Sequence, residues 1–152
     1  MKLIDNYDGL LLDLDGVVYR GREPIADAIE TIGKLSAKMP IGYVTNNASR
    51  TQGQIADQLR GFGLNLDESQ VISSAMAAAE MLSEQIAGKV LVIGGDGLRK
   101  AVSDHGFEVV TSADDGPDAV IQGFSPDIGW KDLAEASYAI NNGALWLATN
   151  QD

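Results

Sequence analysis

The sequence contains no cysteine and only one histidine among its 152 residues. The absence of cysteine excludes disulfide bonds, thiolate nucleophiles and metal sites built on cysteine, and it fits the reducing conditions of the cytoplasm. Apolar runs are short, and none approaches the roughly 20 residues that a membrane-spanning helix needs. The N-terminus lacks a basic segment followed by an apolar one, so we expect no secretory signal peptide and a cytoplasmic location.

Basic residues are also scarce. Lysine and arginine together number 11, against 22 aspartates and glutamates, which gives a formal net charge of −11. An acidic protein repels nucleic acids and anionic membranes at long range, so we expect neither as a partner. An anionic small molecule would have to be held locally, by a metal ion or by backbone amides.

The most informative stretch is Gly-Leu-Leu-Leu-Asp-Leu-Asp-Gly at residues 9–16. Its three leucines are too few for a helix and predict a central strand of a parallel sheet, buried on both faces. Asp13 and Asp15 follow at once, and Gly16 allows the chain to turn sharply. Because ligands of open α/β sheets bind beyond the carboxyl ends of strands, we expect both acids at a functional site.

The rest of the chain alternates helical and strand patterns. The expected helices cover residues 25–35, 49–62, 75–86, 98–105 and 130–142, and the further strands cover 41–45, 71–72, 89–93, 107–110, 119–124 and 144–148. Ser49 and Gln52 form a candidate capping box for the second helix. Strands that alternate with helices indicate parallel pairing with right-handed crossovers, so we predict an α/β fold.

The alternating pattern restarts at Gly88, which predicts two domains, residues 1–87 and residues 88–152. The last predicted strand is followed only by Asn-Gln-Asp at residues 150–152. A parallel α/β unit normally continues into a helix at that point. We therefore expect the chain to be the first part of a longer protein.

The two acids suit phosphate chemistry. An aspartate at a strand end can attack phosphorus and form an aspartyl-phosphate, and a second one can protonate the leaving alcohol and then deprotonate water. Each carboxylate about 4 Å from a phosphate charge would cost roughly 4 kcal/mol at an effective dielectric near 20. A divalent cation is therefore required, and Mg²⁺ prefers such oxygen ligands.

Thr45 is the last residue of the strand predicted at residues 41–45, and Asn46 follows it directly. They lie about one strand-helix-strand unit after Asp13, which predicts neighbouring strand ends. A hydroxyl group and free backbone amides there could bind phosphate oxygens without adding charge. The residues alone thus outline a phosphate site.

Two motifs resemble those of the haloacid dehalogenase superfamily, specifically its NagD-like, para-nitrophenylphosphatase-like branch. They are Leu-Leu-Asp-Leu-Asp-Gly-Val-Val-Tyr-Arg-Gly at residues 11–21 and Val-Thr-Asn-Asn-Ala-Ser-Arg at residues 44–50. Residues 90–98, 118–120 and 142–150 resemble the same branch in order and spacing, so the likeness covers essentially the whole chain.

The resemblance implies a role for each matching residue. Asp13 would be the phosphorylated nucleophile and a Mg²⁺ ligand, and Asp15 would be the acid and base, with its backbone carbonyl on the metal. Thr45 and the amide of Asn46 would hold the transferring phosphoryl group, and Asn47 would support that loop.

The resemblance also implies a three-layer Rossmann-like core in residues 1–87 and an α/β cap domain in residues 88–152, through which related proteins form homo-oligomers. The lysine and the acidic pair that complete the family's site belong after the cap, and they are not found in this sequence. Gly95 and Asp96 superficially resemble the acidic motif, but its second acid is replaced by Lys100 or Ala101, so we reject that substitution.

The leading hypothesis is a Mg²⁺-dependent phosphatase acting on a small phosphorylated metabolite. Candidate substrates are sugar phosphates, glycerol phosphate, phosphoglycolate and nucleoside monophosphates. One alternative is a truncated, non-catalytic fragment of such an enzyme. Another is a metal-dependent glycosyltransferase that uses Asp-x-Asp, although that hypothesis leaves Thr45 and Asn46 unexplained.

Other conspicuous residues have simpler interpretations. The glycines of Gly94–Gly97 predict a tight turn, since their spacing does not match a nucleotide-binding loop. His105 falls in the last turn of a predicted helix, where a structural role is expected. Trp130 and Trp146 are expected to be packing anchors.

Overall fold

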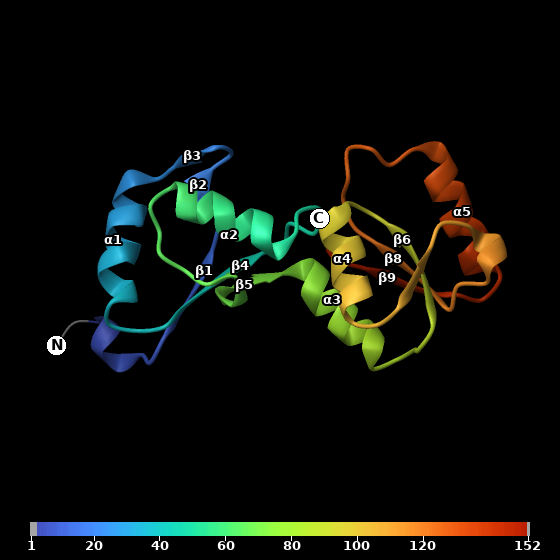
Figure 1. The fold of residues 1–152 in the computed structure, drawn as a ribbon, viewed down its shortest axis with the longest axis horizontal. Helices are drawn as coiled ribbons and strands as arrows, with labels where there is room; N and C mark the ends of the chain where they lie inside the picture. The colour runs from blue at the N-terminus through green and yellow to red at the C-terminus, as the bar shows by residue number, and fades with distance from the viewer. Residues whose placement is uncertain (1–2, 152) are drawn as a thin grey trace. The chain divides into compact units, whose positions relative to one another are not determined.

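The computed structural model describes residues 3–151 and divides into two compact units (Figure 1). The first unit runs to Thr45 and continues over Gln52–Ile72, and the second comprises Asn46–Thr51 and the chain from Ser73 onward. Both units combine helices with a sheet, which confirms the predicted α/β class. No helix in the described part of the chain is long and apolar enough to cross a membrane.

The first unit contains a three-stranded sheet in the order β1-β4-β5, formed by β1 (Leu10–Asp13), β4 (Ile41–Thr45) and β5 (Val71–Ser73). Strands β1 and β4 are parallel. The other elements of this unit are η1 (Leu3–Asn6), the short antiparallel strands β2 (Tyr19–Arg20) and β3 (Glu23–Pro24), α1 (Ala26–Ser36), α2 (Gln52–Gly61) and η2 (Glu68–Gln70).

The core of the first unit joins the sheet to its helices and to the loop after β1. Its fully buried members include Leu14 and Val18 from that loop, Tyr43 from β4, and Ile55 and Leu59 from α2. Burying a side chain of this size stabilises the fold by about 1.5–3 kcal/mol. The loop after β1 is therefore anchored as firmly as a regular element.

The prediction that β1 is buried on both faces is wrong. Its residues alternate between half-buried and exposed, and the side chain of Leu11 is 75% exposed. In the described residues β1 pairs only with β4 and lies at the edge of the sheet. A run of leucines does not reveal whether one or both faces of a strand are covered, because every second side chain points to the opposite face.

The predicted start of the second helix is also wrong, since α2 begins at Gln52 and not at Ser49. The side-chain oxygen of Asn47 accepts hydrogen bonds from the backbone N–H of Ser49, its hydroxyl and the backbone N–H of Arg50, at 3.0, 2.8 and 3.2 Å. Asparagine often binds backbone groups just after itself in this way. These bonds hold Ser49 in a turn that precedes the helix.

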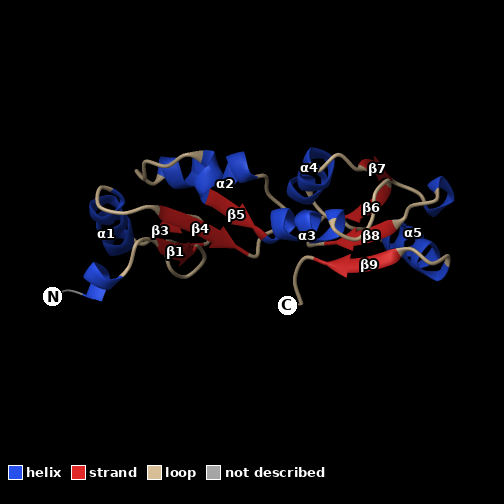
Figure 2. Cartoon of the chain, turned by 90° about the horizontal axis from the view of Figure 1, so that it is seen from below, coloured by secondary structure: helices blue, strands red, loops and turns tan. Residues whose placement is uncertain are grey.

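The second unit contains a four-stranded parallel sheet in the order β7-β6-β8-β9 (Figure 2). Its strands are β6 (Lys89–Ile93), β7 (Glu108–Val110), β8 (Ala119–Gln122) and β9 (Leu145–Ala148). Its helices are α3 (Ser74–Ser83), α4 (Asp96–Asp104), the short η3 (Ala113–Asp115) and α5 (Trp130–Asn141). The predicted parallel pairing is thus confirmed for this sheet.

Alternate residues of β6 face different helices, which gives this unit three layers. Val90 and Val92 pack with residues of α3 and α4, while Leu91 and Ile93 pack with Ala136 and Ala139 of α5. Each of these four residues is at most 3% exposed. A strand covered on both faces is usually a continuous apolar run, and the strand predicted at residues 89–93 is confirmed.

Helix α3 belongs to the second unit. It is capped by the Ser73 side chain and packs against α4, so Ile72 and Ser73 lie in different units. Gly88 is a loop residue with φ +133° inside the second unit. The division of the protein into a catalytic core and a cap stays a prediction.

The two tryptophans do not anchor the core, contrary to expectation. Trp130 is 84% exposed and Trp146 is 58% exposed within this chain. The buried face of α5 is formed by the small residues Ala136 and Ala139. Trp146 lies on a strand whose residues alternate between half-buried and exposed, and it is on the exposed side.

Candidate active site

Asp13 and Asp15 flank a fully buried residue. Leu14 has no exposed surface, whereas both aspartates are exposed. Asp13 is the last residue of β1, and Asp15 follows it just beyond the end of the strand.

The backbone after β1 forms a tight turn that is held by hydrogen bonds to Leu14. The carbonyl oxygen of Leu14 accepts hydrogen bonds from the backbone N–H groups of Val17, Val18 and Tyr19, at 3.3, 2.9 and 3.2 Å. Gly16 has φ +82°, a conformation that favours glycine, and its N–H donates to Tyr19 O at 2.7 Å. The two aspartates thus lie at the start of a rigid turn.

Asp13 has one close local hydrogen bond, in which its Oδ1 accepts the N–H of Leu14 at 2.8 Å. Asp15 Oδ1 is 3.5 Å from the N–H of Gly21, which is at the outer limit of a hydrogen bond. Both side chains are exposed, so solvent can reach their carboxylate oxygens. They are accessible to a metal ion or a substrate.

Thr45 ends the strand next to β1. Asp13 lies opposite Val44 in the parallel register, so Thr45 is one residue further along the neighbouring strand. Adjacent strands of a sheet are about 4.8 Å apart. Thr45 is only 7% exposed, which makes it one of the few buried polar residues among those described. The expected placement of Asp13 and Thr45 at neighbouring strand ends is confirmed.

Asn46 and Asn47 follow Thr45 directly but belong to the second unit. The carbonyl oxygen of Asn46 accepts a hydrogen bond from the Ser74 hydroxyl at 2.8 Å. The Asn47 side chain accepts the three hydrogen bonds that shape the following turn. This loop has a defined conformation, while the roles of Asn46 and Asn47 in phosphate binding stay predictions.

The donor set suits a hard cation with few protein ligands. Among the described residues, no three His, Cys, Asp or Glu side chains gather in a way that could hold a metal ion. That excludes, for this part of the chain, a zinc site closed by three or four side chains. Mg²⁺ keeps several waters and often takes only one or two protein carboxylates besides carbonyl oxygens, so the Asp13 carboxylate and the backbone carbonyl of Asp15 would fit it.

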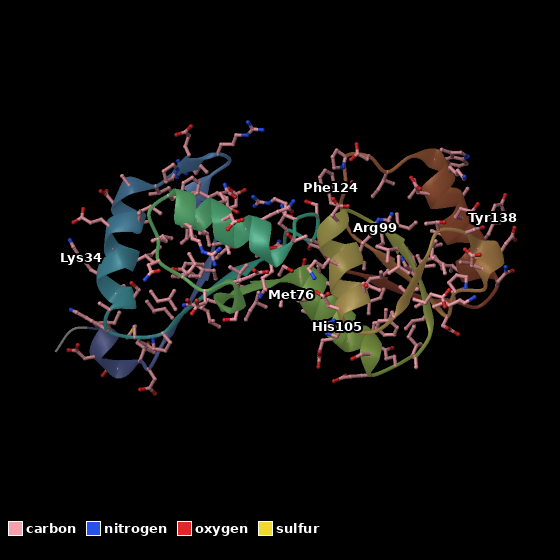
Figure 3. The ribbon with its side chains drawn as sticks, viewed as in Figure 1. Lys34, Met76, Arg99, His105, Phe124 and Tyr138 are labelled. Atoms are coloured by element: carbon pink, nitrogen blue, oxygen red, sulfur yellow. The ribbon has the colours of Figure 1, made fainter. Side chains whose placement is uncertain are left out.

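A pocket that sequence reasoning missed lies wholly within the second unit. Its volume is about 430 Å³, and its lining includes Asn46, Gln122, Phe124, Ile128, Trp146 and Asn150. The indole N–H of Trp146 donates to Gln122 Oε1 at 3.2 Å. Phe124 is 72% exposed and is labelled in Figure 3. The signal was available, because β8 ends at Gln122 and β9 at Ala148, and ligands favour such strand ends.

The comparison with known families decides the assignment. Residues 10–108 match the family described as haloacid dehalogenase-like hydrolase. The chain belongs to this family. The resemblance drawn from the motifs at residues 11–21 and 44–50 is thereby confirmed.

Relatives within this hydrolase family are phosphatases by name. The chain is 40% identical to the D-glycerol 3-phosphate phosphatase of Mycobacterium tuberculosis, over 99% of this chain and 43% of that protein. It is 38% identical to the 5'-nucleotidase YutF of Bacillus subtilis, over 96% of this chain and 57% of that protein. The chain spans about half the length of these relatives.

A solved structure of the family shares the fold. The crystal structure of glycerol phosphate phosphatase Rv1692 from Mycobacterium tuberculosis in complex with magnesium matches with a TM-score of 0.89 and 42% identity. The match covers 95% of this chain and 44% of that one. A member of this family at that level of identity therefore binds magnesium.

Proposed function

We propose that this hydrolase acts as a Mg²⁺-dependent phosphatase of small phosphomonoesters, with Asp13 as its nucleophile. The observation that carries the proposal is the register of β1 and β4, in which Asp13 lies opposite Val44 and one residue before the level of Thr45. Membership of the hydrolase family and the names of the relatives support it.

In the proposed reaction the Asp13 carboxylate attacks phosphorus in line with the leaving alcohol. A bond forms between Asp13 and phosphorus, the ester P–O bond breaks, and Asp15 gives its proton to the departing oxygen. Asp15 then removes a proton from water as that water attacks the phosphorus of the aspartyl-phosphate. The bond between Asp13 and phosphorus breaks and inorganic phosphate leaves, which returns Asp13 to a carboxylate and leaves Asp15 protonated as at the start.

The neighbouring strand would hold the phosphoryl group. The Thr45 hydroxyl and the backbone N–H of Asn46 can donate hydrogen bonds to its oxygens, in positions set before the substrate arrives. Mg²⁺ held by the Asp13 carboxylate and the backbone carbonyl of Asp15 would supply the positive charge that offsets the repulsion between the attacking carboxylate and the phosphate.

The substrate class follows from the chemistry and from the relatives. Their names refer to glycerol phosphate and nucleotides, which fall among the small phosphomonoesters expected from the sequence. We therefore retain sugar phosphates, glycerol phosphate, phosphoglycolate and nucleoside monophosphates as candidates. We further propose that residues 88–152 form the cap domain that the resemblance implies.

A second candidate is a chain that binds phosphate but does not turn it over. The chain spans about half the length of its relatives, and no third acid joins Asp13 and Asp15 in the described residues. The family assignment gives no support to the glycosyltransferase alternative.

The test measures phosphate release from para-nitrophenyl phosphate and glycerol phosphate with Mg²⁺. It uses this chain alone and a chain extended to the length of the relatives. Release by the extended chain, lost in Asp13→Asn and on chelation of the metal, supports the proposal. If the extended chain is folded and neither form releases phosphate, the phosphatase proposal is overturned.

A further inference from the structure

The segment Asn46–Thr51 follows Thr45 directly in the chain, yet it is part of the second unit. Its backbone meets the start of α4 at very short range. The N–H of Gly97 donates to Ser49 O at 3.0 Å. A Cβ atom on Gly97 would lie 2.1 Å from Arg50 O, and one on Gly95 would lie 2.7 Å from Ser49 O. The opposing atoms belong to the backbone, so they have no flexible side chain that could move aside.

The conformation of these glycines does not explain their presence. Gly95 and Gly97 both lack the positive φ that favours glycine, and Gly97 lies in the first turn of α4, where alanine would stabilise a helix more. The expected turn is limited to a bend at Gly94. What requires glycine at positions 95 and 97 is the close approach of Ser49 and Arg50.

Two further contacts hold the same segment. Ala48 is 3% exposed and belongs to the core cluster that contains Leu98 and Ala75. The hydroxyl of Ser74, at the first position of α3, donates to the carbonyl oxygen of Asn46 at 2.8 Å. The segment is thus bound at its beginning, its middle and its end.

We propose that Ser74, Gly95 and Gly97 are positioning residues for the phosphate-binding loop. They hold the backbone of Asn46–Arg50 in one conformation, so that the N–H of Asn46 is ready for a phosphoryl oxygen before the substrate binds. Donors that are set in advance stabilise an anion more than donors that must first be ordered. This inference rests on the proposed function, in which Asn46 contacts the phosphoryl group.

The decisive variant is Ser74→Ala, which removes one hydrogen bond without adding bulk. Its matched control is Ser83→Ala in the same helix, where the Ser83 hydroxyl donates to the carbonyl oxygen of Glu80 at 2.7 Å. Ser74→Thr keeps the hydroxyl and should restore the wild-type values. Gly97→Ala tests the close approach, with Gly33→Ala as control, because a Cβ on Gly33 in α1 meets nothing within 4 Å.

Two quantities are measured on each variant: the Kd for inorganic phosphate with Mg²⁺, by NMR titration, and kcat and KM for para-nitrophenyl phosphate in the extended chain. Ser74→Ala should raise the Kd about 3- to 10-fold, as expected for one hydrogen bond, and kcat/KM should fall by a similar factor. Gly97→Ala should have a larger effect. The melting temperature of Ser74→Ala should match that of Ser83→Ala, which separates positioning from stability.

If the wild type binds phosphate and Ser74→Ala has the same Kd, kcat and KM as Ser83→Ala, the inference is overturned while the proposed function stands. A wild type that neither binds nor releases phosphate overturns both. Should Gly97→Ala fail to fold, the comparison of Ser74→Ala with Ser74→Thr still decides.

Discussion

Asp13 on β1 lies opposite Val44 on β4, so that Thr45 follows at the end of the neighbouring strand. This register brings a carboxylate from one motif and a hydroxyl from the next to the same edge of one sheet.

Asp13→Asn should lower kcat by at least about 1,000-fold, since an amide is a far weaker nucleophile than a carboxylate. The side chain is exposed, so the melting temperature should stay close to that of the wild type. The control is Asp8→Asn, an exposed acid in the loop before β1. Equal activity of the two variants would remove Asp13 from the mechanism.

Thr45→Val should lower kcat/KM by about 10- to 100-fold, the usual effect of losing a hydrogen bond to a charged group. Valine has nearly the same shape as threonine, so the 7% exposed site remains filled. Thr45→Ser keeps the hydroxyl and should retain most of the activity. A Thr45→Val enzyme with unchanged kinetics would show that this hydroxyl does not contact the phosphoryl group.

The ring of His105, labelled in Figure 3, makes hydrogen-bond contacts with both α4 and α3. Its Nδ1 lies 2.8 Å from Ala101 O and its Nε2 lies 3.0 Å from Glu80 Oε2. The hydrogen bond to Ala101 is the largest cause of a pKa raised above the ordinary 6.5, with partial burial opposing it and Glu80 and Asp104 adding to it. The folded state therefore favours the protonated ring.

A raised pKa gives a contribution to stability that is complete below about pH 6.5 and is lost as the pH rises through the folded-state value. The free energy of unfolding should thus differ most between wild type and His105→Gln at acidic pH, and the difference should shrink toward pH 8. Urea titrations at a series of pH values measure it. If the difference in the free energy of unfolding does not change with pH, the folded state does not favour the protonated ring of His105.

Glu135 on α5 supports the turn before η3. Its Oε2 accepts hydrogen bonds from the N–H of Ala113 at 2.7 Å and from the Ser112 hydroxyl at 3.0 Å. These bonds, that of Ala113 first, lower the pKa of Glu135 below its ordinary value of 4.5. The stabilisation is therefore present above that value and is lost as the pH falls through the folded-state pKa.

Glu135→Ala should lower the melting temperature at pH 7 more than Glu84→Ala, which changes an exposed glutamate at the end of α3. The gap between the two variants should narrow when the melts are repeated at a pH below the ordinary pKa of 4.5 that is low enough for Glu135 of the wild type to gain its proton. Differential scanning calorimetry at both pH values provides the comparison. Equal melting temperatures at pH 7 would contradict a supporting role for Glu135.

Much of the fold could be predicted because the spacing of apolar residues indicates whether a segment forms a helix or a strand. The strands at 41–45 and 89–93 were predicted with the bounds that β4 and β6 have in the structure. The positions of Asp13 and Thr45 followed from the same pattern, since strand ends of a parallel sheet share one edge. Elements with weak patterns were harder to delimit, as the start of α2 shows.

The predictions that were wrong or missing concern which side chains are covered by other parts of the chain. Leu11, Trp130 and Trp146 are apolar but exposed in this chain, and composition cannot say which apolar side chains are covered. The reason for Gly95 and Gly97 was equally hidden, because the atoms that approach them come from residues far away in the sequence. The pocket lined by Asn46, Gln122 and Asn150 could have been sought at the ends of β8 and β9, although Asn46 is remote from both strands in the sequence.

By itself the sequence determined the α/β class, the family and the two strand-end motifs, because periodicity and local motifs are properties of neighbouring residues. Only the tertiary structure decided which side chains are covered, how the chain divides into units, and that the loop after Thr45 packs against Gly95 and Gly97 of the second unit, to which it belongs. Those features depend on distances between segments that are remote in the chain, and no local pattern encodes them.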